Sequence, residues 1–150
     1  MNILALDLAT QTGWATNYEG KRCGTAKFEV KRGESPGMRF LRCRAWLKDM
    51  RDLLHRKIDL IVYEQAHYRG GAATAACVGL ATEVIAFAAE YSIEIMAVHT
   101  KELKRFATGK GNAKKPEMIQ AAKDRGYEPA NDDEGDAALL LEFAMSELKL

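Results

Sequence analysis

Four acidic residues could act together, and two of them lie in apolar segments, where a carboxylate is costly unless it has a partner. Asp7 interrupts an apolar segment near its end, and Glu64 ends a second apolar segment. Asp133 and Asp136 are three positions apart, which would place both on one face of a helical turn. Because ligand sites in α/β sheets gather at the carboxyl ends of strands, we expect the four side chains to converge in one cleft.

Four carboxylates in one cleft cannot all stay ionised unless cations are bound between them. Oxygen ligands select hard ions, so the set predicts two Mg²⁺ ions per active site, with Mn²⁺ as a substitute, and not zinc. Such a pair can hydrolyse a phosphodiester, one ion activating water and the other stabilising the leaving 3′ oxygen. Taken singly, each acid also has a structural explanation, in a strand-end turn or at a helix N-terminus.

Charge is segregated along a chain that is nearly neutral as a whole. The sequence contains 22 Lys plus Arg and 21 Asp plus Glu, for a net charge of +1. One segment, 101–115, contains a single acid and the basic residues Lys101, Lys104, Arg105, Lys110, Lys114 and Lys115. With two divalent ions bound, the chain would be clearly positive, which favours a polyanionic partner.

Length and composition predict one globular domain over residues 1–150. The chain is 47% hydrophobic and 29% charged, and its three cysteines lack the spacing of a disulfide scaffold or a zinc site. No basic region precedes the first apolar run, so we expect no signal peptide. The longest weakly polar stretch, 70–82, has about 13 residues, whereas a membrane span needs roughly 20. We therefore expect no membrane association and a cytoplasmic location, in a bacterial cell or in a cell infected by a phage or virus.

Hydrophobic periodicity predicts the elements that position the acids. Strands are expected at 2–8, 14–18, 22–30, 58–64 and 93–98, with a turn at 10–13. Helices are expected at 38–54, 72–90, 101–107, 116–125 and 132–148. Thr100 is a candidate N-cap for the third helix, and Asn131 or Asp132 for the last. The order βββαβαβααα predicts an α/β fold: a mixed five-stranded sheet, an antiparallel meander followed by parallel strands, with helices on both faces.

Four segments, in their order and spacing, resemble the RuvC family of Holliday-junction resolvases in the RNase H-like superfamily. They are ILALDLATQTGWA at 3–15, IVYEQ at 61–65, LKRFATGKGNAKK at 103–115 and DEGDAA at 133–138. The resemblance extends over nearly the whole chain. The first segment alone also resembles the phosphate-loop strand of actin-like ATPases, but a second phosphate loop and a second lobe have no room in 150 residues.

The resemblance implies a homodimeric endonuclease in which each subunit nicks one strand of a four-way DNA junction. The nicks would have 5′-phosphate and 3′-hydroxyl ends. The implied catalytic and metal-binding carboxylates are Asp7, Glu64, Asp133 and Asp136. Asp132 remains an alternative to Asp133, because it is also on the helical face of Asp136. The Ala-rich segment 72–90 has two interpretations, as core or as the dimer seam.

The resemblance also implies DNA contacts for the basic segment. Lys104 and Lys115 match basic positions of the family, and the further candidates are Arg105, Lys110 and Lys114. His67 and Tyr68 are the candidates for an aromatic residue that stacks on bases. The basic residues of 38–54 have two interpretations, as a second DNA surface or as a solvated helix face.

One departure from the family concerns the residues after the first acid. The family often has glycine and proline there, whereas this chain has Leu8 and Ala9. We therefore expect the changed loops to affect junction selectivity and cleavage-sequence preference more than nuclease chemistry. The alternatives are a nuclease for flaps, forks or single strands, an inactive junction-binding domain, and an actin-like nucleotide-binding module.

Overall fold

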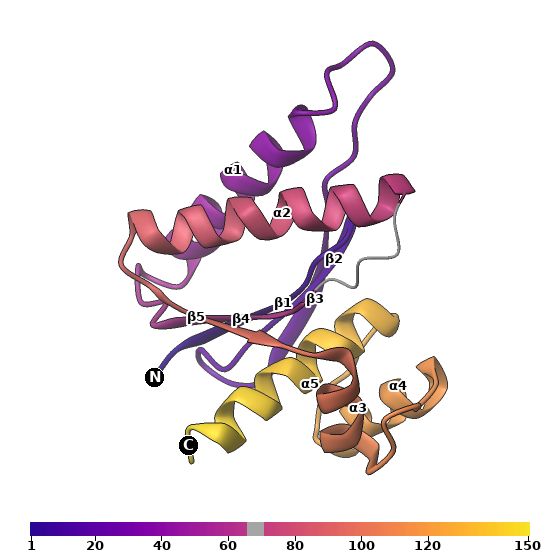
Figure 1. Ribbon diagram of the computed structural model, residues 1–150. Helices are drawn as coiled ribbons and strands as arrows, with labels where there is room; N and C mark the ends of the chain where they lie inside the picture. The colour runs from indigo at the N-terminus through magenta and orange to yellow at the C-terminus, as the bar shows by residue number, and fades with distance from the viewer. Residues whose placement is uncertain (66–70) are drawn as a thin grey trace.

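The computed structural model describes residues 1–65 and 71–150, which form one mixed sheet covered by helices (Figure 1). The strands are β1 (Ile3–Asp7), β2 (Gln11–Thr16), β3 (Arg22–Lys27), β4 (Leu60–Glu64) and β5 (Glu94–Val98). The helices are α1 (Met38–Leu53), α2 (Gly71–Glu90), α3 (Thr100–Thr108), α4 (Lys115–Asp124) and α5 (Asp132–Glu147). Their order along the chain confirms the predicted βββαβαβααα.

The sheet has the strand order β3-β2-β1-β4-β5. β1, β2 and β3 form the antiparallel meander, while β4 pairs in parallel with both β1 and β5. This arrangement confirms the predicted mixed sheet. It also places the carboxyl ends of β1 and β4 side by side.

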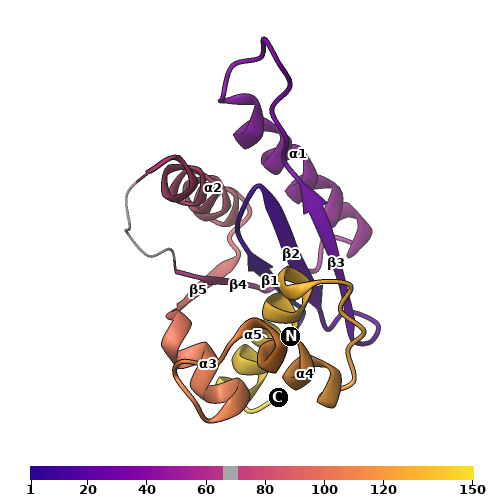
Figure 2. The same cartoon turned by 90° about the vertical axis from the view of Figure 1, so that its right-hand side faces the viewer.

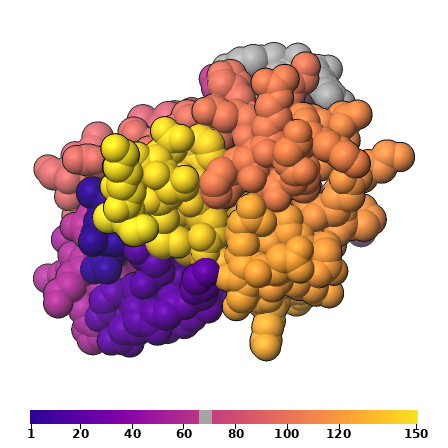
Figure 3. Space-filling model, turned by 90° about the horizontal axis from the view of Figure 1, so that it is seen from below, coloured from indigo at the N-terminus to yellow at the C-terminus, as the bar shows by residue number. Residues whose placement is uncertain are grey.

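Helices cover both faces of the sheet, as predicted (Figure 2). Leu4 and Leu6 of β1 point to the face that α1 and α2 cover, whereas Ile3 and Ala5 point to the face covered by α5. α5 lies on the sheet, and α3 and α4 pack against α5. From below, the C-terminal part of the chain lies between the N-terminus and the segment that carries α3 and α4 (Figure 3).

Two local predictions were wrong, and in each case a long-range contact explains the difference. Residues 11–13 are part of β2 and not a turn, because they pair with both β1 and β3. The turn is shorter, and the hydroxyl of Thr12 in β2 donates across it to the carbonyl oxygen of Ala9 at 2.6 Å. Thr100 is the first residue of α3, after the N-cap His99, and its hydroxyl is hydrogen-bonded elsewhere.

α2 matches the helix predicted at 72–90, and it is longer than the weakly polar stretch 70–82 because the helix continues through Glu83. It has 20 residues, of which an 18-residue stretch has a mean hydropathy of 1.7, so by length and composition alone it could cross a membrane. One side belongs to the core, with Leu80, Val84 and Phe87 fully buried. The opposite side is open, and Ile85 is 45% exposed there. Core packing therefore explains only one side of this apolar helix.

Candidate active site

Asp7 and Glu64 lie next to each other at the carboxyl ends of adjacent strands. β1 and β4 are parallel, and Leu6 is opposite Tyr63, so the next residues of the two strands are neighbours. Side chains alternate between the faces of a sheet. Asp7 therefore follows Ile3 and Ala5, and Glu64 follows Leu60 and Val62, onto the face covered by α5.

The first turn of α5 lies directly on the meander beside Asp7. Asp7 is opposite Gly13 in β2, and Gly13 is opposite Thr25 in β3. A Cβ atom added to Gly13 would lie 2.0 Å from the carbonyl oxygen of Asp133. Only glycine allows the helix backbone to approach the sheet this closely. Asn131 caps the helix, accepting a hydrogen bond from the Glu134 amide at 2.9 Å.

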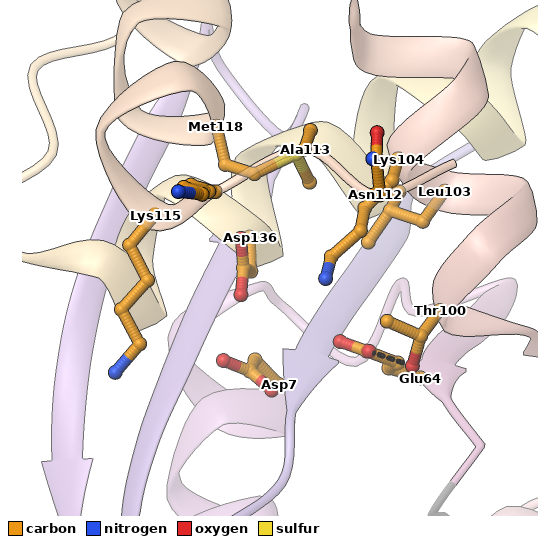
Figure 4. A pocket seen from close by; sticks show the side chains of 11 residues that line it. Asp7, Glu64, Thr100, Leu103, Lys104, Asn112, Ala113, Lys115, Met118 and Asp136 are labelled. Atoms are coloured by element: carbon orange, nitrogen blue, oxygen red, sulfur yellow. Dashed lines mark hydrogen bonds between the residues drawn. The ribbon is translucent and has the colours of Figure 1, made fainter. Parts of the chain in front are cut away.

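Three of the four predicted carboxylates meet in one pocket (Figure 4). Asp7, Glu64 and Asp136 each offer an oxygen atom, and these atoms lie within 4.8 Å of one another. The pocket has a volume of about 550 Å³, and α3, α4 and the segment between them form its other walls. An all-oxygen set of this size fits a divalent cation such as Mg²⁺ or Mn²⁺.

Asp133 and Asp132 have different surroundings. The Asp133 carboxylate is next to Asp7 and also accepts a hydrogen bond from Nε2 of Gln11 at 3.0 Å. Asp132 instead forms an ion pair with Lys115, with 3.4 Å between Oδ2 and Nζ. Of the two alternatives left open by the sequence, this geometry favours Asp133 as the fourth carboxylate.

The carboxylates repel one another strongly. Burial, together with the charges of Asp136, Glu64 and Asp133, raises the pKa of Asp7 well above its ordinary range. Burial and the charges of Glu64, Asp132 and Asp133 raise the pKa of Asp136 to about 7, and Lys104 opposes this rise. Without a cation, the ionised cluster therefore destabilises the fold.

We expect Asp136→Asn to stabilise the protein in EDTA. The ordinary pKa of the Asp136 carboxyl is 3.8 and its folded value is about 7, so the folded chain binds the extra proton between these pH values. Stability is therefore lost as the pH rises through this window. Thermal unfolding at pH 8 should show a Tm at least about 3 °C higher in the variant, because a chain of this length gains about 2–4 °C in Tm per kcal/mol of added stability.

The control for this melt is Asp49→Asn, which removes an exposed acid of α1. It should leave the Tm within about 1 °C of the wild type, as most surface changes do. Mg²⁺ should stabilise the wild type more than Asp136→Asn, because a bound ligand stabilises the state that holds it. Equal melting of wild type and Asp136→Asn in EDTA would refute the repulsion.

Sequence reasoning missed three residues that hold the carboxylates in place. They are Gln11, which donates to Asp133, Gly13 under α5, and Thr100, whose hydroxyl donates to Oε1 of Glu64. The first two were assigned to a turn, and Thr100 was assigned to helix capping. A polar residue two positions after the end of β5, the strand beside β4, was the available signal for Thr100.

The basic segment contributes three of its predicted DNA-binding residues to the pocket. Lys104, Lys114 and Lys115 line it, together with Asn112. Arg105 lies outside this pocket, in a hollow with His99, Lys101 and Glu102. Lys110 is exposed, and its Nζ lies 4.0 Å from Glu117. His67 and Tyr68 lie outside the described residues.

The basic residues of α1 are largely engaged within the chain. Arg39 donates to the carbonyl oxygen of Phe28, and Arg42 forms a 2.6 Å ion pair with Glu34. Arg44 pairs with Glu83 and Glu90 of α2. These contacts favour the interpretation of α1 as a structural helix over that of a second DNA surface.

Comparison with known proteins identifies the fold. No protein-family model and no curated protein matches the chain. Among solved structures, a Thermus thermophilus RuvC in complex with Holliday junction substrate matches with a TM-score of 0.77 and 20% identity, covering 98% of this chain and 94% of that one.

Two further structures have the same architecture. The yeast mitochondrial Holliday junction resolvase Ydc2 matches with a TM-score of 0.63 and 15% identity, over 98% of this chain and 80% of that one. The fowlpox virus resolvase with its substrate Holliday junction DNA has a TM-score of 0.54 and 12% identity, over 99% of both chains. The chain therefore has the RNase H-like α/β fold, in the form found in RuvC-like Holliday-junction resolvases.

Proposed function

We propose that the protein is a metal-dependent endonuclease that resolves four-way DNA junctions. The observation that supports this most directly is the convergence of Asp7, Glu64 and Asp136 beside a lysine-lined pocket. The fold is shared with resolvases whose structures contain Holliday junction DNA, which supports the choice of substrate. An actin-like nucleotide-binding module has no comparable support.

Asp7, Glu64, Asp133 and Asp136 would hold two Mg²⁺ ions, and Mn²⁺ would substitute. When bound, the ions supply an activated water and stabilisation of the leaving 3′ oxygen, which yields 5′-phosphate and 3′-hydroxyl ends. Thr100 and Gln11 hold the carboxylates of Glu64 and Asp133 in orientation through their hydrogen bonds. Lys104 is close enough to Asp136 to lower its pKa, so its ammonium also partly offsets the charge of the cluster.

The proposed assembly is a homodimer that forms through the open side of α2. Two nicks in opposing strands require two active sites, and one chain provides a single carboxylate cluster among its described residues. The open side of α2 includes small or apolar residues at helical spacing: Ala75, Val78, Ile85 and Ala89. A second copy would cover this apolar surface, and sedimentation at micromolar concentration tests for it.

We expect Lys104→Ala combined with Lys115→Ala to weaken DNA binding. Both side chains line the pocket, and Lys115 is 81% exposed despite its ion pair with Asp132. Each lost phosphate contact should reduce the slope of log affinity against log salt by about 1, so the double variant should lose about 2. Fluorescence anisotropy of a labelled junction in EDTA, from low to high salt, measures this slope.

The matched control is Lys48→Ala combined with Lys57→Ala, which removes two exposed lysines from α1 and from the segment before β4. This pair should leave the salt slope unchanged. An unchanged slope in the Lys104 and Lys115 variant would remove the basic segment from the DNA interface. A reduced slope in the control would instead support the second DNA surface on α1.

A panel of substrates separates the proposed function from its nearest alternative. We expect cleavage of a four-way junction to be faster than cleavage of matched duplex, flap and single-stranded DNA by at least about tenfold, or about 1.4 kcal/mol. Comparable cutting of flaps or single strands would keep the metal site but make the protein a broader branched-DNA nuclease. Junction binding without cutting of any substrate would indicate an inactive binding domain.

A further inference from the structure

Glu134 is a buried acid that the proposed chemistry does not use. It directly follows Asp133 in the first turn of α5, but it is only 7% exposed. Its side chain points to β3, on the other side of this turn from Asp7. A buried carboxylate is costly unless its oxygens are hydrogen-bonded, so its partners indicate what the residue does.

Both oxygens of Glu134 are hydrogen-bonded. Thr25 of β3 donates its hydroxyl to Oε2 at 2.5 Å, and the backbone amide of Ala130 donates to Oε1 at 3.1 Å. The thiol of Cys23 makes a longer contact with Oε1, at 3.8 Å. The helix cap joins the same network, because Nδ2 of Asn131 donates to the Thr25 hydroxyl oxygen at 3.1 Å.

The network and the pocket lie at the two ends of one row of cross-strand neighbours in the sheet. Asp7, Gly13 and Thr25 are cross-strand neighbours in β1, β2 and β3. The first turn of α5 rests on this row, with its backbone over Gly13 and Glu134 bound to Thr25. Asp133 and Asp136 then face Asp7 from the other side of the turn.

Repulsion between the carboxylates acts against this arrangement. When ionised, the carboxylates of Asp7 and Asp136, whose oxygens lie within 4.8 Å of each other, push the first turn of α5 away from β1. The hydrogen bonds of Glu134 hold the same turn to β3 and to the segment before the helix. When a residue that orients a metal ligand without touching the metal is lost, metal affinity commonly falls by 10- to 100-fold.

We propose that Glu134 is a positioning residue, which with Thr25 and Asn131 holds Asp133 and Asp136 in place for metal binding. The proposal rests on the proposed function only in taking the carboxylates as metal ligands. Glu134 itself touches neither the metal site nor the substrate. Its loss should therefore weaken metal binding without removing a ligand.

Mn²⁺ binding to the protein without DNA, measured by titration calorimetry, tests this role. Glu134→Ala should bind Mn²⁺ roughly tenfold more weakly than the wild type. Thr25→Val removes the donor from β3 and leaves α5 unchanged in sequence, so it should weaken binding in the same direction. It also keeps the test usable if Glu134→Ala does not fold.

Two variants separate positioning from charge and from general stability. Glu134→Gln keeps the shape and one acceptor oxygen but removes the charge, so it should bind Mn²⁺ within about threefold of the wild type. Glu142→Ala breaks a comparable network further along α5, where that carboxylate accepts from Tyr127 at 2.9 Å and pairs with Lys21 at 2.8 Å. It should lower the Tm and leave Mn²⁺ affinity within about twofold of the wild type.

Each contrary result has a distinct meaning. Wild-type affinity in Glu134→Ala, or an equal loss in Glu142→Ala, would overturn the positioning role. If Glu134→Gln binds Mn²⁺ as weakly as Glu134→Ala, the effect comes from the charge of Glu134, and the positioning role is again overturned. A wild type that binds Mn²⁺ but cuts no junction would contradict only the proposed function, and a wild type that binds no Mn²⁺ would overturn both.

Discussion

Asp7→Asn should abolish junction cleavage while the protein still binds the junction. Asp7 is at the centre of the cluster, since Glu64, Asp133 and Asp136 all raise its pKa. Asparagine has nearly the same shape but is a neutral ligand, so both metal affinity and metal placement should be lost. We expect cleavage to fall by at least about 1000-fold, or roughly 4 kcal/mol in the barrier.

DNA affinity provides the second half of this prediction. The substitution removes a negative charge near the phosphates, so binding in EDTA should be unchanged or slightly tighter. Asp49→Asn is the matched control, because it removes an equal charge from an exposed position on α1 and should cleave like the wild type. Cleavage by Asp7→Asn at the wild-type rate would show that the carboxylate cluster is not the active site.

Gly13→Ala should reduce cleavage by at least about 100-fold, although it changes no predicted catalytic residue. The new Cβ would lie 2.0 Å from the carbonyl oxygen and 2.3 Å from the carbonyl carbon of Asp133. Backbone atoms cannot rotate away, so the first turn of α5 must shift on β2 and take Asp133 and Asp136 with it. Displacements of about 1 Å in a catalytic arrangement can cost 100-fold in rate.

The control for this prediction is Gly24→Ala, in the neighbouring strand and on the other face of the sheet. There the added Cβ would meet the Trp14 ring at 2.6 Å, and this partly exposed side chain can move. We expect Gly24→Ala to lose stability but to keep cleavage within about tenfold. Cleavage rates and melting curves measured on both variants separate loss of activity from loss of stability. An equal loss of cleavage in the two variants would contradict the special role of Gly13.

Local periodicity predicted the element order. The mixed sheet followed from that order, and the convergence of acids followed from the rule that ligand sites gather at the carboxyl ends of strands. Ile3 and Ala5 alternate with Leu4 and Leu6, so the face of Asp7 follows from its position in β1. The end of β4 places Glu64 in the same way. Asp136 was predictable because helical spacing relates it to Asp133.

What the sequence did not predict depends on contacts between distant segments. Gly13 and Gln11 resemble turn residues until their pairing with β1 and β3 is known. Glu134 resembles one more acid in a helix N-terminal cluster, and nothing local shows that it turns away from Asp133 to bind Thr25. The choice between Asp132 and Asp133 likewise depends on Lys115 and Gln11, which belong to different segments.

The most direct test of the proposed activity is cleavage of a four-way junction labelled on each strand, incubated with the wild type in Mg²⁺, Mn²⁺ or EDTA. We predict paired, symmetric nicks with 5′-phosphate and 3′-hydroxyl ends in either metal, and none in EDTA. The nicks should also be absent with Asp7→Asn in Mg²⁺. Intact junctions in both metals, under conditions where the wild type binds them, would contradict the proposal that this chain is a metal-dependent resolvase.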